Sequence, residues 1–165
     1  MKTGIGFDIH VLADGRPLVL GGITVPFPRG LLGHSDGDVV LHALADATLG
    51  ALGKPDIGIC FPDDDPGTRG MDSSVIVEKA VGIMKDEGYR VGNADIIIMC
   101  EEPRLSSYYE EIRTNIAGLL EIPPQNVGCK ARTFEGIGAI GAGEAIASMA
   151  SVTLKPAGHP DGEET

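Results

Sequence analysis

An aspartate and a histidine lie two positions apart near the start of the chain, in the stretch GFDIH that contains Asp8 and His10. The surrounding residues TGIGFDIHVL predict a β-strand, in which alternate side chains point to the same side. The carboxylate and the imidazole would then project together and could offer one oxygen and one nitrogen to a metal ion. A pair of this kind is also typical of a strand face exposed to solvent.

A third candidate ligand lies in the predicted helix DVVLHALADATLGALG. Asp38, His42 and Asp46 are spaced four apart and would share one face of that helix. The helix contains no Lys or Arg, so these carboxylates lack the ion-pair partners that a solvated face usually has. Asp8, His10 and His42 together would supply one oxygen and two nitrogens, which suits tetrahedral Zn²⁺ with an open fourth position.

The composition limits the classes of partner that the protein can have. The 165 residues are enough for one domain with one sizeable core. The chain has 24 Asp and Glu against 13 Lys and Arg, a formal net charge of −11, which argues against nucleic-acid or anionic-membrane binding. An anionic small substrate would need metal ions or backbone N–H groups to offset its charge. No apolar run reaches the ~18 residues of a membrane span.

The cysteines predict a reducing compartment. Cys60, Cys100 and Cys129 are widely spaced, and the chain has no C-x-x-C pattern. The N-terminus lacks the features of a secretory signal peptide. We therefore expect reduced thiols in a cytoplasmic protein, with Cys60 and Cys129 as small core residues and no chemistry at Cys100.

The elements that must position these residues can be predicted from periodicity and turn residues. They are a strand at 3–12, a hairpin at 16–27, helices at 38–53, 73–88 and 105–122, and strands at 93–103, 126–133 and 144–155. Asp72 or Ser73 would cap the second helix, and Ser107 and Glu110 would form a capping box on the third. Residues 54–73 are expected to form a long loop.

This order of elements predicts an α/β (α+β) sandwich, a mixed β-sheet with helices packed on one face in a ferredoxin-like arrangement. Residues 1–155 would form a single domain. Residues 156–165 would form a disordered tail.

Several motifs in order resemble those of the 2-C-methyl-D-erythritol 2,4-cyclodiphosphate synthase family: GFDIH, LLGHSDGDVVLHALADATLGA, DIG, FPDDDPGTRGMDS, GYRVGNADIII and KARTFE. The resemblance extends from about Lys2 to Lys155. It implies that 4-diphosphocytidyl-2-C-methyl-D-erythritol 2-phosphate is converted to the cyclic diphosphate with release of CMP, in the non-mevalonate isoprenoid pathway. It also implies a homotrimer with active sites between neighbouring subunits.

The resemblance assigns roles to individual residues. Zn²⁺ would be held by Asp8, His10 and His42, and Mg²⁺ or Mn²⁺ near Glu135 would bridge the two phosphates of the substrate. His34 and Thr133 match positions that stabilise the transition state. The positions that match the erythritol phosphate side are Ser35, Asp38 and Phe61-Pro62-Asp63-Asp64-Asp65. Those that match the cytidine side are Asp56, Ile57, Gly58, Cys100, Glu101, Glu102, Pro103, Arg104, Leu105 and Ser106. The expected substrate-binding residues also include Asp8, His10, His34, Arg132, Thr133, Phe134 and Glu135.

The reaction agrees with the types of residue present. Its nucleophile is a phosphate oxygen, which is largely ionised at neutral pH and needs no Ser, Cys or protein base to activate it. In-line attack of the 2-phosphate on the β-phosphorus requires mainly positioning and neutralisation of charge. Two divalent ions would supply the neutralisation that an acidic protein lacks.

Two other interpretations compete with this one. The segment 136–141 spells G-x-G-x-x-G, but the strand predicted after it and the lack of a suitably placed acidic residue before the tail argue against dinucleotide binding. A second alternative is a catalytically impaired homologue that binds metal and nucleotide only. It is motivated by four departures from the family pattern, at Arg132, Phe134, Ala139 and Ala142. Arg132 could add a cation near the phosphates or pair with surface carboxylates, Phe134 could narrow the pocket or simply pack, and Ala142 puts in doubt the binding of an isoprenoid in the central cavity of the trimer.

Overall fold

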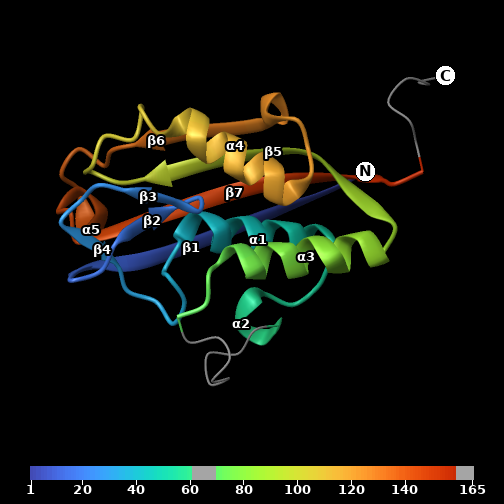
Figure 1. Cartoon of the computed structure of the whole chain (residues 1–165), viewed down its shortest axis with the longest axis horizontal. Coiled ribbons are helices and arrows are strands. Elements are labelled where there is room, and N and C mark those ends of the chain that lie inside the picture. Colours follow the sequence, from blue (N-terminus) through green and yellow to red (C-terminus); the bar gives the residue numbers. More distant parts are fainter. Residues whose placement is uncertain (61–69, 159–165) are drawn as a thin grey trace.

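The structure is a computed structural model of the chain, and it describes residues 1–60 and 70–158 (Figure 1). Its elements are β1 (Lys2–Asp14), β2 (Leu18–Leu20), β3 (Ile23–Val25), β4 (Arg29–Leu31), α1 (Val39–Ala51), α2 (Ile57–Cys60), α3 (Ser74–Asp86), β5 (Tyr89–Met99), α4 (Tyr109–Leu120), the 3₁₀ turn η1 (Pro124–Asn126), β6 (Val127–Arg132), α5 (Gly138–Gly141) and β7 (Ala145–Pro156). The three long helices and the long strands follow one another in the predicted order.

One mixed sheet of five strands, in the order β4-β1-β7-β5-β6, forms the centre of the molecule. The pair β5–β6 is parallel, and the other three pairs are antiparallel. The predicted hairpin is confirmed as the separate pair β2–β3. Gly21 and Gly22 form its turn with φ of 63° and 77°, values that residues with a side chain rarely adopt.

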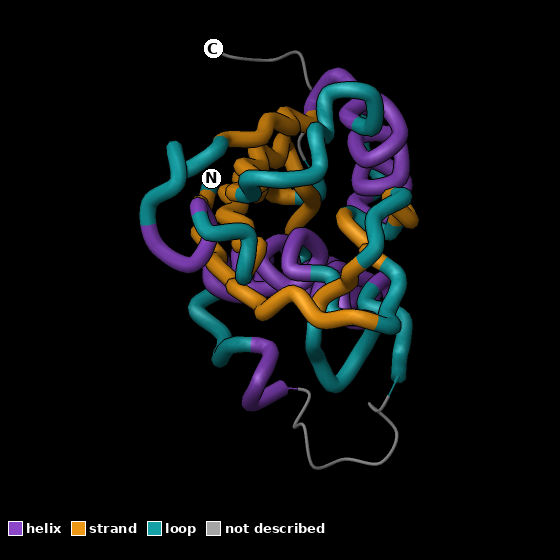
Figure 2. Tube along the Cα trace, turned by 90° about the vertical axis from the view of Figure 1, so that its left-hand side faces the viewer, coloured by secondary structure: helices purple, strands orange, loops and turns teal. Residues whose placement is uncertain are grey.

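Helices α1, α3 and α4 lie on one side of the sheet (Figures 1 and 2). Helix α1 lies directly on β1 because Gly4 and Gly6 have no side chains on that face. A Cβ at these positions would clash with the carbonyl oxygens of Ala47 and Ala43. This close contact brings the helix within reach of Asp8, which is the next residue on the same face of β1.

The opposite face of β1 carries large apolar side chains that the described part of the chain leaves exposed. Ile5, Phe7, Ile9 and Val11 alternate with the residues that face α1, and all four are exposed in the single chain. Met149, on the paired strand β7, is exposed as well. The predicted alternation in β7 is confirmed, since Ile146, Ser148, Ala150, Val152 and Leu154 are all buried.

The predicted capping box of the third helix is wrong. Helix α4 begins at Tyr109, and its N-cap residue Tyr108 makes no side-chain cap hydrogen bond. The chain first makes a turn in which the Tyr108 N–H donates to the Leu105 carbonyl at 2.9 Å. Glu110 is instead paired with Arg113, at 2.6 Å.

Other boundaries differ by small amounts. β5 runs from Tyr89 to Met99, so it begins and ends earlier than predicted, because its first residues pair with the end of β7. The predicted loop 54–73 contains the short helix α2, and the glycine-rich turn contains α5. Strand β7 extends to Pro156, one residue into the predicted tail, and residues 159–165 lie outside the described residues. Among residues 1–60 and 70–158, no helix is long and apolar enough to cross a membrane.

Candidate metal centre

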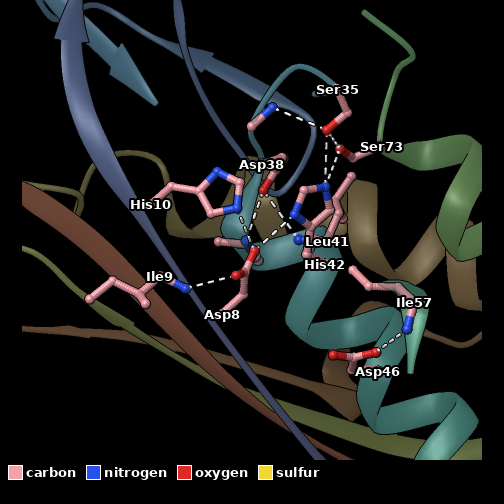
Figure 3. A network of polar contacts seen from close by, with 12 residues as sticks. Asp8, Ile9, His10, Ser35, Asp38, Leu41, His42, Asp46, Ile57 and Ser73 are labelled. Atoms are coloured by element: carbon pink, nitrogen blue, oxygen red, sulfur yellow. Dashed lines mark hydrogen bonds and ion pairs between the residues drawn. The ribbon is translucent and has the colours of Figure 1, made fainter. Parts of the chain in front are cut away.

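The three predicted metal ligands come together where β1 meets α1 (Figure 3). Asp8 and His10 project from the same face of β1, and His42 lies on the first turn of α1. The Asp8 Oδ2 atom is 3.0 Å from His10 Nε2 and 2.8 Å from His42 Nδ1. One ligand atom from each residue lies within 4.8 Å of the others. These three residues are called the metal group below.

The donor atoms of the metal group fit a divalent cation. A carboxylate can only accept hydrogen bonds, so each short contact from Asp8 to a ring nitrogen requires a proton or a cation on that nitrogen. One divalent ion bound by all three atoms would replace both protons. The loop residue Gly33 lies close to the His10 ring, since a Cβ at this position would be 2.9 Å from His10 Cε1. This close contact helps to fix the orientation of the ring.

Electrostatics keep the carboxylate of this group ionised. Burial of Asp8 opposes ionisation, but the hydrogen bonds from His10 and His42 outweigh it, so the Asp8 pKa lies well below its usual value. The hydrogen bond with Asp8 raises the pKa of His10, although burial acts in the opposite direction. Asp8 is therefore available as a charged ligand, and a metal ion must compete with a proton for His10.

The other two polar residues of the predicted helix stripe do not join the metal group. Asp38 caps α1 and is fully buried, and its oxygens accept hydrogen bonds from the N–H groups of Gly21, Gly22, Val40 and Leu41 at 2.6–3.1 Å. Burial raises the Asp38 pKa to about 6, against these backbone donors. Asp46 accepts from the Ile57 N–H at 2.8 Å and so holds α2. Backbone donors, rather than a metal or substrate, explain why these carboxylates lack Lys or Arg partners.

A cavity of about 230 Å³, called the first cavity here, opens beside the metal group. It includes the predicted substrate residues His34, Ser35, Ile57 and Gly58 in its wall. Met71 and Ile76 provide apolar surface in the same wall. Asp56 lies just before α2 and accepts from the Ile59 N–H at 3.0 Å, and the predicted residues Phe61, Pro62, Asp63, Asp64 and Asp65 lie outside the described residues.

Most of the remaining predicted residues border a second pocket of about 180 Å³, whose wall does not include Glu102, Phe134 or Glu135. Its wall comprises Cys100, Glu101, Pro103, Arg104, Leu105, Ser106, Tyr109, Ala131, Arg132 and Thr133. The described wall of the first cavity shares no residue with this set. Within one chain, the predicted site residues are therefore divided between two separate hollows.

A family model described as the YgbB family matches residues 1–155. The chain belongs to the YgbB family. It is 49% identical to the 2-C-methyl-D-erythritol 2,4-cyclodiphosphate synthase of Geobacillus kaustophilus over 154 residues, which cover 93% of this chain and 98% of the relative. This match confirms the resemblance identified from the motifs.

Solved structures of YgbB relatives share the fold. A 2C-methyl-D-erythritol-2,4-cyclodiphosphate synthase in a CDP-bound form aligns with a TM-score of 0.87 and 36% identity, over 93% of this chain and all of that one. The bifunctional IspDF from Campylobacter jejuni aligns with a TM-score of 0.90 and 38% identity over 94% of this chain. The present chain spans 42% of that bifunctional protein.

The segment with the predicted departures from the family pattern begins at the second pocket, whose wall includes Arg132 and Thr133. Thr133 Oγ1 donates to Glu135 Oε1 at 3.2 Å, and the Phe134 N–H donates to Glu101 Oε2 at 3.0 Å. The Arg132 guanidinium donates to the Ala131 carbonyl at 3.0 Å and borders the pocket. All four residues from Arg132 to Glu135 are exposed, so their side chains are accessible to a ligand or a partner subunit.

Sequence reasoning missed two residues that hold the metal group, Asp36 and Ser73. Ser73 Oγ lies 2.9 Å from His42 Nε2 and donates to Asp36 Oδ1 at 2.5 Å. Ser73 was expected only as a helix cap, but its side chain makes no cap hydrogen bond. Ser73 and His42 are 31 residues apart in the sequence, so no local sequence pattern could predict this contact.

Proposed function

We propose that this protein is a 2-C-methyl-D-erythritol 2,4-cyclodiphosphate synthase, a cyclising phosphorus–oxygen lyase of non-mevalonate isoprenoid biosynthesis. It would convert 4-diphosphocytidyl-2-C-methyl-D-erythritol 2-phosphate to the cyclic diphosphate and release CMP. The observation that carries the proposal is the convergence of Asp8, His10 and His42 beside a cavity. The name of the relative that is 49% identical over nearly its whole length supports the substrate.

The metal group would hold Zn²⁺, and Glu135 would bind Mg²⁺ or Mn²⁺ at the diphosphate. When bound, these ions would neutralise phosphate charge and make the β-phosphorus more electrophilic. Ionised Asp8 supplies the negative charge that favours a cation in this cavity. The loop of Gly33 and the helix α1 hold the two imidazoles in fixed positions, so little reorganisation is needed when a ligand binds.

The chain would bind and orient the substrate rather than provide a nucleophile. The attacking 2-phosphate oxygen carries its own negative charge, so no side chain needs to remove a proton from it. His34 and Ser35 border the first cavity, where they would contact the reacting phosphates. Thr133 would donate to the diphosphate from the second pocket, and residues 100–106 would surround the cytidine.

A cytoplasmic homotrimer would bring the two hollows together. The metal group lies in the first cavity and Thr133 in the second, so one chain by itself divides the proposed machinery. The exposed apolar side chains Ile5, Phe7 and Ile9 provide a surface that a second copy could bury. A first cavity of one subunit would then face the second pocket of its neighbour, which completes the site.

A metal analysis combined with a CMP-release assay tests the proposal. Purified protein should contain about one zinc per chain and release CMP only in the presence of a divalent ion. Dialysis against a chelator should stop CMP release, and added Zn²⁺ and Mg²⁺ should restore it. Protein that binds neither zinc nor CDP would contradict the proposal.

The catalytically impaired homologue is the second candidate, and the departures at Arg132 and Phe134 favour it. Phe134 is 36% exposed beside the predicted diphosphate site, where a bulky ring could displace substrate. In that case, the protein would bind zinc and CDP but produce no CMP. Recovery of CMP release in the double variant Arg132→Thr/Phe134→Ser would assign the loss to these two residues.

A further inference from the structure

Two serine hydroxyls lie within hydrogen-bond distance of the His42 nitrogen that faces away from Asp8 (Figure 3). His42 Nε2 lies 3.0 Å from Ser35 Oγ and 2.9 Å from Ser73 Oγ. The two hydroxyls are 3.1 Å apart, and Ser73 Oγ is 2.5 Å from Asp36 Oδ1. The Gly37 N–H donates to Ser35 Oγ at 3.2 Å. The ring is therefore held from both nitrogens.

The hydrogen-bonding capacity of these groups fixes the direction of each proton. The Asp36 carboxylate can only accept, so the single proton of the Ser73 hydroxyl is donated to Asp36. Ser73 Oγ must then accept from both of its other neighbours, which are His42 Nε2–H and the Ser35 hydroxyl. Ser35 Oγ in turn accepts the Gly37 N–H. This arrangement satisfies every donor and places a proton on Nε2, whether Nδ1 carries a second proton shared with Asp8 or a metal ion in its place.

We infer that Ser73 and Asp36 form a relay that positions His42 as a metal ligand, by keeping a proton on Nε2 and holding the ring so that Nδ1 faces Asp8 and is the atom left to bind the metal. Metal-ligating histidines commonly donate their second ring N–H to such a partner, which fixes the tautomer and the ring orientation. Ser73 and Asp36 act through His42 and are positioning residues. The inference rests on the metal centre that is part of the proposed function.

The surroundings of Ser73 favour this role over helix capping. A serine at an N-cap usually accepts an N–H from the first turn of its own helix. Ser73 occupies the N-cap of α3 without such a bond, and Asp72 Oδ1 accepts the Ser74 N–H at 2.8 Å instead. The Ser73 side chain is fully buried and directed at His42, which is on another helix. Its hydroxyl is thus committed to the relay.

The backbone keeps the relay in place. Asp36 Oδ2 accepts the Ser73 N–H at 3.2 Å, and the Asp36 N–H donates to the Met71 carbonyl at 3.1 Å. The Gly70 N–H donates to the His34 carbonyl at 2.7 Å. These bonds tie the start of α3 to the loop before α1, so the hydroxyl of Ser73 approaches His42 at a fixed position.

The first test measures the affinity of the protein for Zn²⁺ by competition with a chromophoric chelator. Ser73→Ala should raise the zinc Kd by about 10–100-fold, the usual cost of losing a partner of a metal-ligating histidine. Ser74→Ala, which changes the neighbouring serine on the same helix, should leave the Kd unchanged. Asp36→Asn should weaken zinc binding in the wild-type background but have little further effect in Ser73→Ala, because the two residues act as one unit.

The second test needs no metal. Nitrogen-15 NMR of the metal-free protein should show a His42 Nε2–H signal that exchanges slowly with water, because this group is buried and hydrogen-bonded. The exchange should become faster in Ser73→Ala and stay slow in Ser74→Ala. Thermal unfolding of each metal-free variant checks that the fold is retained.

The outcomes separate the relay from the proposed metal centre. If wild-type protein binds no zinc, the metal centre and with it the positioning role are overturned. If wild-type protein binds zinc and Ser73→Ala binds it equally well, the relay alone is overturned. Slow Nε2–H exchange in Ser73→Ala, or additive effects of Ser73→Ala and Asp36→Asn, would also contradict the relay.

Discussion

At the metal centre, His42 is 7% exposed and both of its ring nitrogens have side-chain partners, whereas at the second pocket all the residues from Arg132 to Ile137 are exposed. The first region is held by hydrogen bonds from three separate segments of the same chain. The second region has one hydrogen bond between neighbouring side chains, from Thr133 to Glu135, and one from the Phe134 N–H to the Glu101 carboxylate. The buried region is therefore organised before any ligand arrives, and the exposed region is left for a ligand or another subunit to order.

This comparison predicts that substitutions in the metal group have the largest effect. His42→Ala removes one of three ligands and should lower the rate of CMP release by about 10³-fold, because the loss of a metal that stabilises charge costs several kcal/mol. Zinc analysis of the purified variant should show substoichiometric metal. An active His42→Ala enzyme with a full complement of zinc would place the metal site elsewhere.

A substitution at the contact between β1 and α1, the two elements that carry the metal group, should lower the stability of the protein. Gly6→Ala forces a Cβ against the backbone carbonyl of Ala43 and should lower the free energy of unfolding by about 1–3 kcal/mol, the usual cost of overpacking. Urea unfolding measures the change. Gly118→Ala is the matched control, since a Cβ there meets no atom within 4 Å and should be neutral or stabilising in helix α4. Equal free energies of unfolding for the two variants would show that β1 and α1 can move apart without loss of stability.

The pair of Asp8 and His10 predicts opposite effects of pH on stability and on metal binding. The His10 pKa is raised in the folded protein, so its pairing stabilises metal-free protein below pH 6.5 and this contribution is lost as the pH rises through the raised pKa. Zinc affinity should increase over the same range, because the competing proton leaves. Thermal melts of metal-free protein and zinc titrations at matched pH measure both trends. Parallel trends would contradict a shared site for the proton and the metal.

The smallest effect is expected at the exposed pocket. Arg132→Ala removes a solvent-exposed cation, and exposed charge pairs contribute about 0–1 kcal/mol, so the CDP affinity should fall by no more than about fivefold. Isothermal titration with CDP in moderate salt measures the change. A fall in CDP affinity of about 10³-fold, as large as the fall in rate expected for His42→Ala, would contradict this expectation. It would indicate that a neighbouring subunit holds the Arg132 side chain in a fixed position.

The parts of the fold and site that could be predicted are those set by short-range patterns. Alternation in GFDIH placed Asp8 and His10 on one face, and helical spacing placed His42 on a helix, which together indicated the metal group. The capping box at Ser107 failed because the turn that follows buried Leu105 moves the start of α4 to Tyr109. Local sequence contains no information on that tertiary constraint.

The rest of the site depends on contacts between distant segments. Asp38 and Asp46 have the charge and the helical spacing expected of metal ligands. In the structure, however, their carboxylates accept hydrogen bonds from backbone N–H groups of the β2–β3 turn and of α2. Ser73 reaches His42 only because Asp36 holds the start of α3 against the loop before α1. Neither arrangement follows from periodicity, because both require the packed tertiary structure.

The two faces of strand β1 have different roles, and both depend on which residues of the strand point toward α1. Its even positions carry Gly4, Gly6 and the metal ligands, while the odd positions Ile5 and Phe7 carry the apolar surface. A one-residue insertion or slip in this strand would exchange the faces, turning the ligands outward and driving bulky side chains against α1. The strand can therefore vary in residue size on its outer face but not in length. Changes to the apolar face or to the metal group must occur by substitution at fixed positions of the strand.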